Sequence, residues 1–432
     1  MKTVNIGIIG LGNVGSAVVN SLIEKKGLLE DRAGMSIRVL KVFDKDPKKM
    51  KAQKLSKNML AESVKDIISD EHIDIIVELI GGVESAREIV LDSFRNKKHV
   101  VTANKALLAE YGDEIFEKAK ECGCLIGFEA SVCGAIPIIK TLKESFIANK
   151  INSIYGIVNG TCNFVLGKMA EESLPMDEAI RLAKKKGIAE ADSRLDLEGI
   201  DSSHKLAILS LLCFGRLVRQ KDIYVEGIND IELQDITYAK IWGYDVKLLA
   251  IAKVKGNKIE MRVHPTLISE KHLLSSVKNE DNAIFITGDM IGDSMLYGKG
   301  AGSLPASSSA ISDIIEIGCN IDTFGVKNRF GNFYFGSHDI NSVSKIGELV
   351  TRYYVRFSAI DRPGVLAGIS GILAKNGISI ATVSQKERKE GQVVPIVMLT
   401  HDAKESSMDN AMKAIDKLKF IKGPSIKIRI ER

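Results

Sequence analysis

The stretch TVNIGIIGLGNVGSAVVNSLIEK, residues 3–25, decides the fold of this chain. It has the pattern of a short buried strand, a turn with GxGxxG spacing, and an amphipathic helix from about Val14. In such a turn the first glycine permits the tight bend, the second lets a pyrophosphate approach the backbone, and the third lets helix and strand pack closely. The motif therefore predicts a dinucleotide-binding domain, with contacts from Gly10, Gly12, Asn13, Val14 and Gly15.

The next strand, IRVLKVFDKD (37–46), indicates how the adenosine ribose would be read. It ends at Asp44, where a carboxylate favours the free 2′-hydroxyl of NAD. Six lysines follow, which could hold the 2′-phosphate of NADP or simply form a solvated helix face: Lys45, Lys48, Lys49, Lys51, Lys54 and Lys57. The pattern leaves the choice between NAD and NADP open.

Two further segments, DIIVELIGG (74–82) and HVVTANKALLAEYG (99–112), continue the alternation of strands and helices. This alternation predicts a Rossmann-like doubly wound sheet, in which ligands bind outside the carboxyl ends of the strands. Gly81, Gly82, Thr102, Asn104 and Lys105 lie at or just after strand ends and are expected on that rim.

Bulk composition limits the other classes of protein. The 432 residues, 45% of them hydrophobic, suffice for two or three domains with cores of their own. The 60 basic and 55 acidic residues are spread along the chain, so nucleic acid is not an expected partner. The sequence shows no signal peptide and no run of 18 apolar residues, so no membrane partner is expected. We expect a cytoplasmic protein with six reduced cysteines.

The middle of the chain carries a dense set of charged side chains beside an apolar helix. The motif NGTCN (159–163) ends an apolar strand and suits a polar substrate, and AKKKGIAEADSRLDLEGIDSSHKLAIL (183–209) follows it. Carboxylates and a lysine next to a buried helix are costly unless they are paired or used on a ligand. Asp201 and Lys205 could form an ordinary helix ion pair, since they are four residues apart. A substrate with an ammonium group and a reducible carbonyl would use both kinds of group.

This segment resembles the signature of homoserine dehydrogenases, matched by Ala183, Gly187, Glu190, Asp196, Gly199, Asp201 and Lys205. The blocks GLGNVG, ELIGG, HVVTANKALLA, EASVCGAIPII, GIVNGTCNF and YGKGAGSLPASSSAISDI resemble the family's other blocks, in family order, across residues 4 to about 318. The resemblance implies reversible reduction of L-aspartate 4-semialdehyde to L-homoserine with NADP or NAD.

The resemblance also implies roles for single residues. Lys205 would be the acid and base, with Asp201 positioning it and Lys105 assisting at the same carbonyl. The substrate would be bound by Glu190, Asp196, Thr161 and Gly160, with the backbone of Gly300 close to the cofactor. A monovalent cation, Na⁺ or K⁺, would be held by Glu129, Val132, Gly134 and Ile136. Cys133 and Ala135 replace common glycines of the family, and Ala191 and Ser193 replace common prolines.

The carboxyl-terminal part has the order strand, helix, strand, strand, helix, strand from residue 353 onward, which predicts a ferredoxin-like βαββαβ fold. The stretch DRPGVLAGISGILAKNGISIATV (361–383) resembles an ACT domain, which implies an amino-acid effector, expected to be L-threonine. Dimerisation alone is an alternative role for the same fold.

Taken together, the patterns predict three domains. A dinucleotide-binding domain spans 1–135 and is completed by 305–340, an α+β catalytic and dimerisation domain spans 136–304, and an ACT domain spans 350–432. A homodimer or homotetramer is expected.

Two other functions fit parts of the sequence. Phosphorylating oxidation of the same semialdehyde would need a nucleophilic cysteine, for which Cys133 and Cys162 lie on candidate loops without an evident base. An amino-acid-sensing binding protein with a catalytically decayed dehydrogenase body would explain the substitutions, but every ionisable group that the chemistry needs is present.

Overall fold

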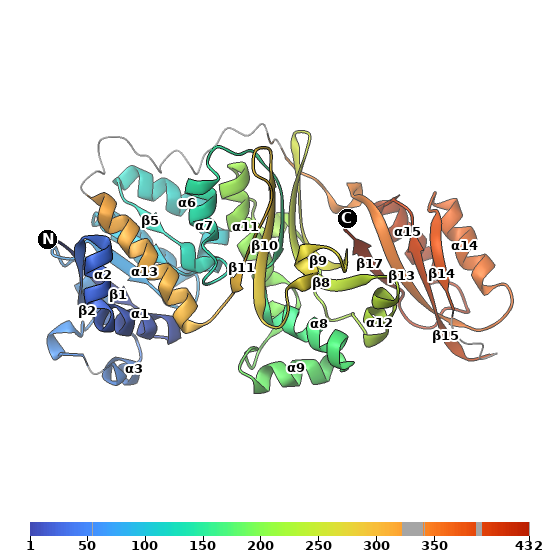
Figure 1. Cartoon of the computed structure of the whole chain (residues 1–432), viewed down its shortest axis with the longest axis horizontal. Coiled ribbons are helices and arrows are strands. Elements are labelled where there is room, and N and C mark those ends of the chain that lie inside the picture. Colours follow the sequence, from blue (N-terminus) through green and yellow to red (C-terminus); the bar gives the residue numbers. More distant parts are fainter. Residues whose placement is uncertain (54, 322–339, 341, 386–390, 432) are drawn as a thin grey trace. The chain divides into compact units, whose positions relative to one another are not determined.

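A computed structural model describes residues 1–53, 55–321, 340, 342–385 and 391–431. The described residues divide into two compact units (Figure 1): those within 1–152, 204–222 and 282–339 form the first, and those within 153–203, 223–281 and 340–432 form the second. No helix in the described part of the chain combines the length and the apolar character that a membrane span requires.

The first unit is an α/β unit with a parallel sheet. Its elements are β1 (Lys2–Ile9), α1 (Asn13–Glu24), α2 (Lys26–Ala33), β2 (Met35–Phe43), α3 (Pro47–Ala52), α4 (Val64–Ile68), β3 (Ile75–Glu78), α5 (Glu84–Arg95), β4 (His99–Thr102), α6 (Lys105–Cys122), β5 (Ile126–Gly127), α7 (Ile138–Lys140), β10 (Asp281–Gly288), β11 (Gly292–Lys299) and α13 (Ser303–Asn320). The strands run in the order β2-β1-β3-β4-β5, with every pairing parallel. This order confirms the predicted doubly wound fold.

The two faces of this sheet follow from alternation along its strands. In β3, Ile75 and Val77 join one apolar core with α1 and α13, whereas Ile76 joins a second core with α4 and α5. Helices therefore cover both faces, as a fully buried parallel sheet requires. The segment expected to complete this domain, 305–340, falls partly on residues 322–339, which lie outside the described residues; its described part, α13, packs into the first core.

The second unit contains a long mixed sheet with helices beside it. Its elements are β6 (Ile151–Ile157), α8 (Gly160–Glu172), α9 (Met176–Lys185), α10 (Arg194–Leu197), α11 (Ile200–Phe214, which continues into the first unit), β7 (Tyr224–Val225), α12 (Leu233–Ile241), β8 (Tyr244–Lys255), β9 (Lys258–Ser269), β12 (Ser342–Val343), β13 (Val350–Ile360), α14 (Val365–Lys375), β14 (Ile380–Ser384), β15 (Val393–Thr400), β16 (Ala403–Lys404), α15 (Glu405–Ile415) and β17 (Ile426–Ile430). Within this unit the sheet runs β6-β8-β9-β17-β13-β15-β14.

The last four strands of that order, with α14 and α15, form the predicted βαββαβ fold. Strand β13 pairs antiparallel with both β15 and β17, and β14 pairs antiparallel with β15. The two helices pack on one core with residues of β13 and β15. On its other side β17 pairs in parallel with β9, which extends the sheet of the ferredoxin-like fold into β9 and β8.

Candidate functional site

The glycine-rich turn lies between β1 and α1, as the sequence predicts. Gly10 has φ +104°, and a Cβ there would come within 2.6 Å of the Leu79 carbonyl oxygen. At Gly15 a Cβ would come within 1.9 Å of the Gly10 carbonyl oxygen, so both positions require glycine. At Gly12, by contrast, a Cβ meets nothing within 4 Å, and no side chain caps the start of α1. The open space above Gly12 at an uncapped helix N-terminus fits a dinucleotide pyrophosphate.

Asp44 follows the last residue of β2 and is tied to this turn. Its carboxylate accepts the backbone N–H of Leu11 at 2.7 Å and that of Asp46 at 2.9 Å. The Lys49 ammonium is 3.9 Å from the same carboxylate. Lys54, another member of the lysine run, lies outside the described residues. The structure therefore places an acid and a lysine together beside the glycine-rich turn.

A buried carboxylate organises the rim at the ends of β3 and β4. Glu78 is fully buried; its carboxylate accepts the Thr102 hydroxyl at 2.5 Å and the backbone N–H of Ile80 at 2.8 Å. Burial raises the pKa of Glu78 to about 7, although both hydrogen bonds favour the charged form. Thr102 in turn accepts the backbone N–H of Asn104, whose side chain caps the helix that begins at Lys105. Thr102, a predicted cofactor contact, is thus buried and supports the rim from behind.

Sequence reasoning placed Asn104 on the rim but did not single out Glu78. The one available signal was an acidic residue at the end of an otherwise apolar strand, in the block ELIGG. Asn104 also donates to the Gly82 carbonyl at 2.7 Å, which joins the two rim loops that carry Gly81 and Lys105.

The expected cation loop lies against the loop that contains Gly300. A Cβ at Gly134 would come within 2.8 Å of the Gly300 carbonyl oxygen, and the backbone N–H of Ala135 donates to the Lys299 carbonyl. Cys133, which stands where the family commonly has glycine, adopts φ +55°, a left-handed conformation that is costly for a residue with a side chain.

At three of the four expected cation ligands, oxygen atoms already accept hydrogen bonds. Both carboxylate oxygens of Glu129 accept backbone N–H groups at 2.8 Å, the Gly134 carbonyl accepts the Ser309 hydroxyl at 2.6 Å, and the Ile136 carbonyl accepts the backbone N–H of Ile138 at 2.7 Å. Each oxygen has a further lone pair, so an alkali cation fits only as an additional partner. In the described part of the chain no three His, Cys, Asp or Glu side chains are grouped as metal ligands.

In the second unit, the NGTCN motif forms the start of α8. Asn159 caps that helix, because its side-chain oxygen accepts the backbone N–H of Cys162 at 2.8 Å. Its amide nitrogen donates to Asp196 at 2.7 Å and to Asp201 at 2.9 Å. The structure therefore brings two of the predicted acids together through a residue to which the sequence analysis gave no role.

The neighbouring residues of this motif are equally constrained. The Thr161 hydroxyl donates to the Ile188 carbonyl at 3.2 Å, and a Cβ at Gly160 would come within 2.5 Å of the Glu280 carbonyl oxygen. Thr161 thereby connects α8 to the turn that leads to Glu190.

The acids of that turn differ in their surroundings. Glu190 is exposed, and among the described residues its side chain makes no hydrogen bond or ion pair. Asp192 is exposed and paired with Arg194, whose guanidinium hydrogen bonds lower the pKa of Asp192 to about 2. Asp192 also accepts the backbone N–H of Arg194, so a local pairing accounts for it.

Lys205 lies on α11, one helical turn after Asp201. Both side chains are only 8% exposed, and the residues that follow on the helix are fully buried. The structure therefore places a buried lysine one helical turn from a buried aspartate. The thiols of Cys133 and Cys162 are buried as well, so neither is an exposed nucleophile.

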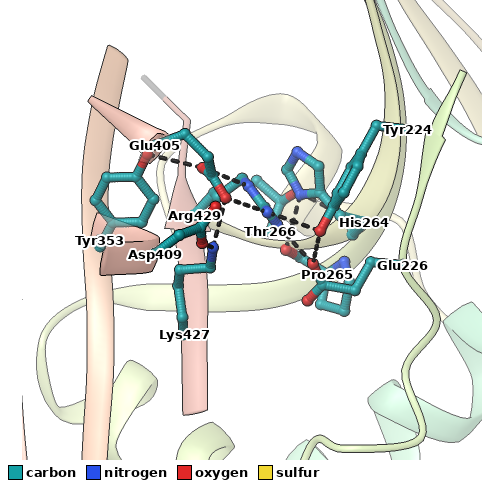
Figure 2. A network of polar contacts seen from close by, with 10 residues as sticks. All are labelled: Tyr224, Glu226, His264, Pro265, Thr266, Tyr353, Glu405, Asp409, Lys427 and Arg429. Carbon is teal, nitrogen blue, oxygen red and sulfur yellow. Dashed lines mark hydrogen bonds and ion pairs between the residues drawn. The ribbon is translucent and has the colours of Figure 1, made fainter. Parts of the chain in front are cut away.

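A buried network of charges connects β17 to β7 and to Glu226, which follows it (Figure 2). The Arg429 guanidinium donates to both carboxylate oxygens of Glu405, at 2.6 and 3.0 Å, to Glu226 at 2.8 Å and to the Tyr224 hydroxyl at 3.0 Å. Burial alone would raise the pKa of Glu405, but Arg429 and then Lys427 lower it overall. Burial, together with Arg429, lowers the pKa of His264 well below its usual value, so His264 is neutral.

The segment held by Arg429 packs against the helix that carries Asp196. The backbone N–H of Ile228 donates to the Leu197 carbonyl at 2.8 Å, and a Cβ at Gly227 would come within 2.3 Å of the same oxygen. The ferredoxin-like fold thus contacts a segment that directly supports α10.

Comparisons with known proteins agree with the fold described above. Three protein-family models match the chain. The model described as "Homoserine dehydrogenase" matches residues 137–315, the model "Homoserine dehydrogenase, NAD binding domain" matches residues 10–129, and the model "ACT domain" matches residues 353–420. The fold and these matches define the class of protein: a nicotinamide-nucleotide oxidoreductase with an ACT domain.

Individual relatives narrow the class. Homoserine dehydrogenases of Bacillus subtilis and Helicobacter pylori are 38% and 40% identical, each over 100% of this chain and 99% of the relative. The crystal structure of a homoserine dehydrogenase from Thiobacillus denitrificans, 39% identical, covers 100% of this chain and 99% of that chain with a TM-score of 0.93. A hyperthermophilic archaeal homoserine dehydrogenase in complex with NADPH, 28% identical, covers 73% of this chain and 97% of that chain with a TM-score of 0.62. The chain belongs to the homoserine dehydrogenase family.

Proposed function

We propose that the chain interconverts L-homoserine and L-aspartate 4-semialdehyde with NAD or NADP. The observation that carries the proposal is the pair of carboxylates, Asp196 on α10 and Asp201 on α11, that Asn159 joins through its amide. Helix α11 continues from Asp201 to Lys205. A bound nicotinamide would supply the hydride to C4 of the substrate, or accept it from there. The remaining work is done by side chains of this protein.

In the oxidative direction, the hydroxyl proton of homoserine passes to the neutral Lys205 amine as the hydride leaves C4. In the reductive direction, the Lys205 ammonium returns that proton to the aldehyde oxygen. Asp201, one turn away on α11, orients Lys205, and Lys105 stabilises the same oxygen. The substrate ammonium is bound by Asp196 and Glu190, and Thr161 and Gly160 complete the pocket.

The cofactor contacts come from the glycine-rich turn and the rim. Gly10, Gly12, Asn13, Val14 and Gly15 hold the pyrophosphate, with Gly81, Thr102 and Gly300 further along. Asp44 receives the ribose, and Lys49, 3.9 Å from it, is available to a 2′-phosphate. If NADP is used, Lys49→Ala raises the KM for NADP and leaves that for NAD unchanged.

Three further features belong to the proposal. The ACT domain binds an amino-acid effector, L-threonine, that lowers turnover. Na⁺ or K⁺ binds beside the carbonyl groups of Val132, Gly134 and Ile136 and beside Glu129. The active form is a homodimer or homotetramer, and the three expected domain ranges are its modules.

The test is the initial rate of homoserine-dependent reduction of NAD and of NADP, with and without L-threonine and with sodium or potassium varied. Lys205→Ala should keep nucleotide binding, measured by fluorescence titration, and lose turnover by about 10²-fold or more. Full turnover in Lys205→Ala would remove Lys205 from its role, and no turnover of the wild-type protein under any ion condition would contradict the proposed reaction.

A further inference from the structure

We propose that Asn159 is a positioning residue that holds Asp196 and Asp201 as one unit. The inference rests on the proposed function, in which Asp196 binds the substrate ammonium and Asp201 orients Lys205. The structure adds a residue that sets the spacing and orientation of both carboxylates at once.

The geometry is specific to a primary amide. One nitrogen, Asn159 Nδ2, donates to Asp196 Oδ1 at 2.7 Å and to Asp201 Oδ2 at 2.9 Å. An amide NH₂ has two hydrogens about 120° apart in one plane, so the two acceptor oxygens lie within about 5 Å of each other. Asn159 lies 37 residues before Asp196 and 42 before Asp201, and its amide bridges the two acids.

The electrostatic consequence is that two like charges can be kept close together. Carboxylates at this separation repel, and each favours the protonated form of the other. A donor shared between them stabilises the ionised form of both, and a neutral amide does so without adding charge. Asn159 is therefore placed to offset the repulsion between the two acids, which ammonium binding and orientation of a lysine both use.

The side-chain oxygen of Asn159 is also held in place. It caps α8 through the N–H of Cys162, and the Cys162 thiol donates to the Asp196 carbonyl at 3.2 Å. One turn later, Asn163 donates to the carbonyl groups of Val277 and Asn279 and accepts from Lys247 at 3.0 Å. The first turn of α8 is thus fixed at both ends, so the amide presents its two hydrogens from a rigid support.

Two substitutions separate the positioning role from helix capping. Asn159→Ser keeps an N-cap oxygen but cannot donate to both acids, and Asn159→Asp keeps the cap but replaces the donor with a third carboxylate. Asn163→Ser is the matched control, because Asn163 is buried in the same turn but contacts backbone carbonyls and Lys247 rather than the two acids.

The experiment measures both KM values, the pH profile and thermal unfolding of these variants. Asn159→Ser should raise the KM for homoserine about tenfold, shift the acid limb of kcat/KM to higher pH, and leave the nucleotide KM within about twofold. Asn159→Asp should raise the homoserine KM further. Asn163→Ser should lower the melting temperature without a selective change in homoserine KM. An unchanged homoserine KM and an unchanged acid limb in Asn159→Ser would overturn the proposal. A lower Tm with equal rises in the homoserine KM and the nucleotide KM would overturn it as well.

A second measurement decides the proposal even if the wild-type protein does not oxidise homoserine. In a double-mutant cycle of urea midpoints with Asn159→Ser and Asp201→Ala, the two shifts should be non-additive, because each substitution removes the same hydrogen bond. Additive shifts would show that the amide and the carboxylate do not interact, independently of any activity.

Discussion

Replacing Arg429 with methionine tests how much the buried network contributes to the second unit. Methionine keeps much of the volume and removes a guanidinium that is 0% exposed and donates four hydrogen bonds to three side chains. The substitution leaves Glu405, 1% exposed, with Tyr353 and Lys427 as its remaining partners.

The magnitude follows from which charge stays buried. Breaking a buried ion pair costs about 3–5 kcal/mol, because the remaining partner is an uncompensated charge. Lys427 still neutralises Glu405 in part, and Glu226 is 32% exposed and can be solvated, so the lower end applies. We expect a loss of about 3 kcal/mol in the free energy of unfolding. For a unit of about 200 residues this corresponds to a urea midpoint lower by roughly 1 M and a Tm lower by about 6–12 °C.

The assay is urea unfolding followed by tryptophan fluorescence. Trp242 is the single tryptophan of the chain, and its ring lies 6.1 Å from that of Tyr354 on β13, so it reports on this unit. Arg181→Met is the matched control in the same unit, since Arg181 is 75% exposed and its ion pair with Glu178 should be worth less than about 1 kcal/mol.

A second substitution makes the reasoning refutable. Adding Glu405→Gln to Arg429→Met removes the uncompensated carboxylate and should recover part of the lost stability. A midpoint of Arg429→Met equal to that of wild type, or a double variant no more stable than the single one, would refute the account of this network.

The remaining predictions concern the first unit. Because the pKa of Glu78 is raised from 4.5 to about 7 in the folded state, its contribution to stability is full below pH 4.5 and is lost, by about 3 kcal/mol, as pH rises to 7. Glu78→Gln should therefore gain stability relative to wild type between pH 5 and pH 8 in urea unfolding, and parallel pH dependences of the two proteins would exclude this role. Gly15→Ala should destabilise the unit because its Cβ would meet the Gly10 carbonyl, whereas Gly12→Ala should leave Tm unchanged and weaken nucleotide binding in a fluorescence titration. Equal Tm values for the two alanine variants would contradict the packing described at Gly15.

The sequence was most informative where one local pattern determines both backbone and chemistry. The glycine-rich turn at Gly10 was predicted because a strand, three glycines and a helix follow one another within 25 residues. The βαββαβ order of the carboxyl-terminal fold was predicted for the same reason. Asp196 and Asp201 were selected because charged residues bordered an apolar helix, a conflict that usually requires a partner.

What the sequence did not reveal depends on pairs that are distant along the chain. Glu226 and Arg429 are separated by 203 residues, and neither stands out in its own segment. Asn159 was one of several polar residues in NGTCN, and nothing local distinguished it from Asn163, which faces backbone carbonyls instead. Glu78 required knowledge of the register between β3 and β4, in which it pairs with Thr102.

The central place of β17 has a consequence for how the protein is synthesised. This strand is translated after every other element that the structure describes, yet it pairs with β13 on one side and β9 on the other. Until residues 426–430 leave the ribosome, the nascent ferredoxin-like fold lacks one of its four strands, and β13 presents an open edge on that side. Open strand edges invite pairing with other chains. Pairing of β17 is therefore the step that closes the sheet, and a chain in which β17 has not yet formed is prone to association through the open edge of β13.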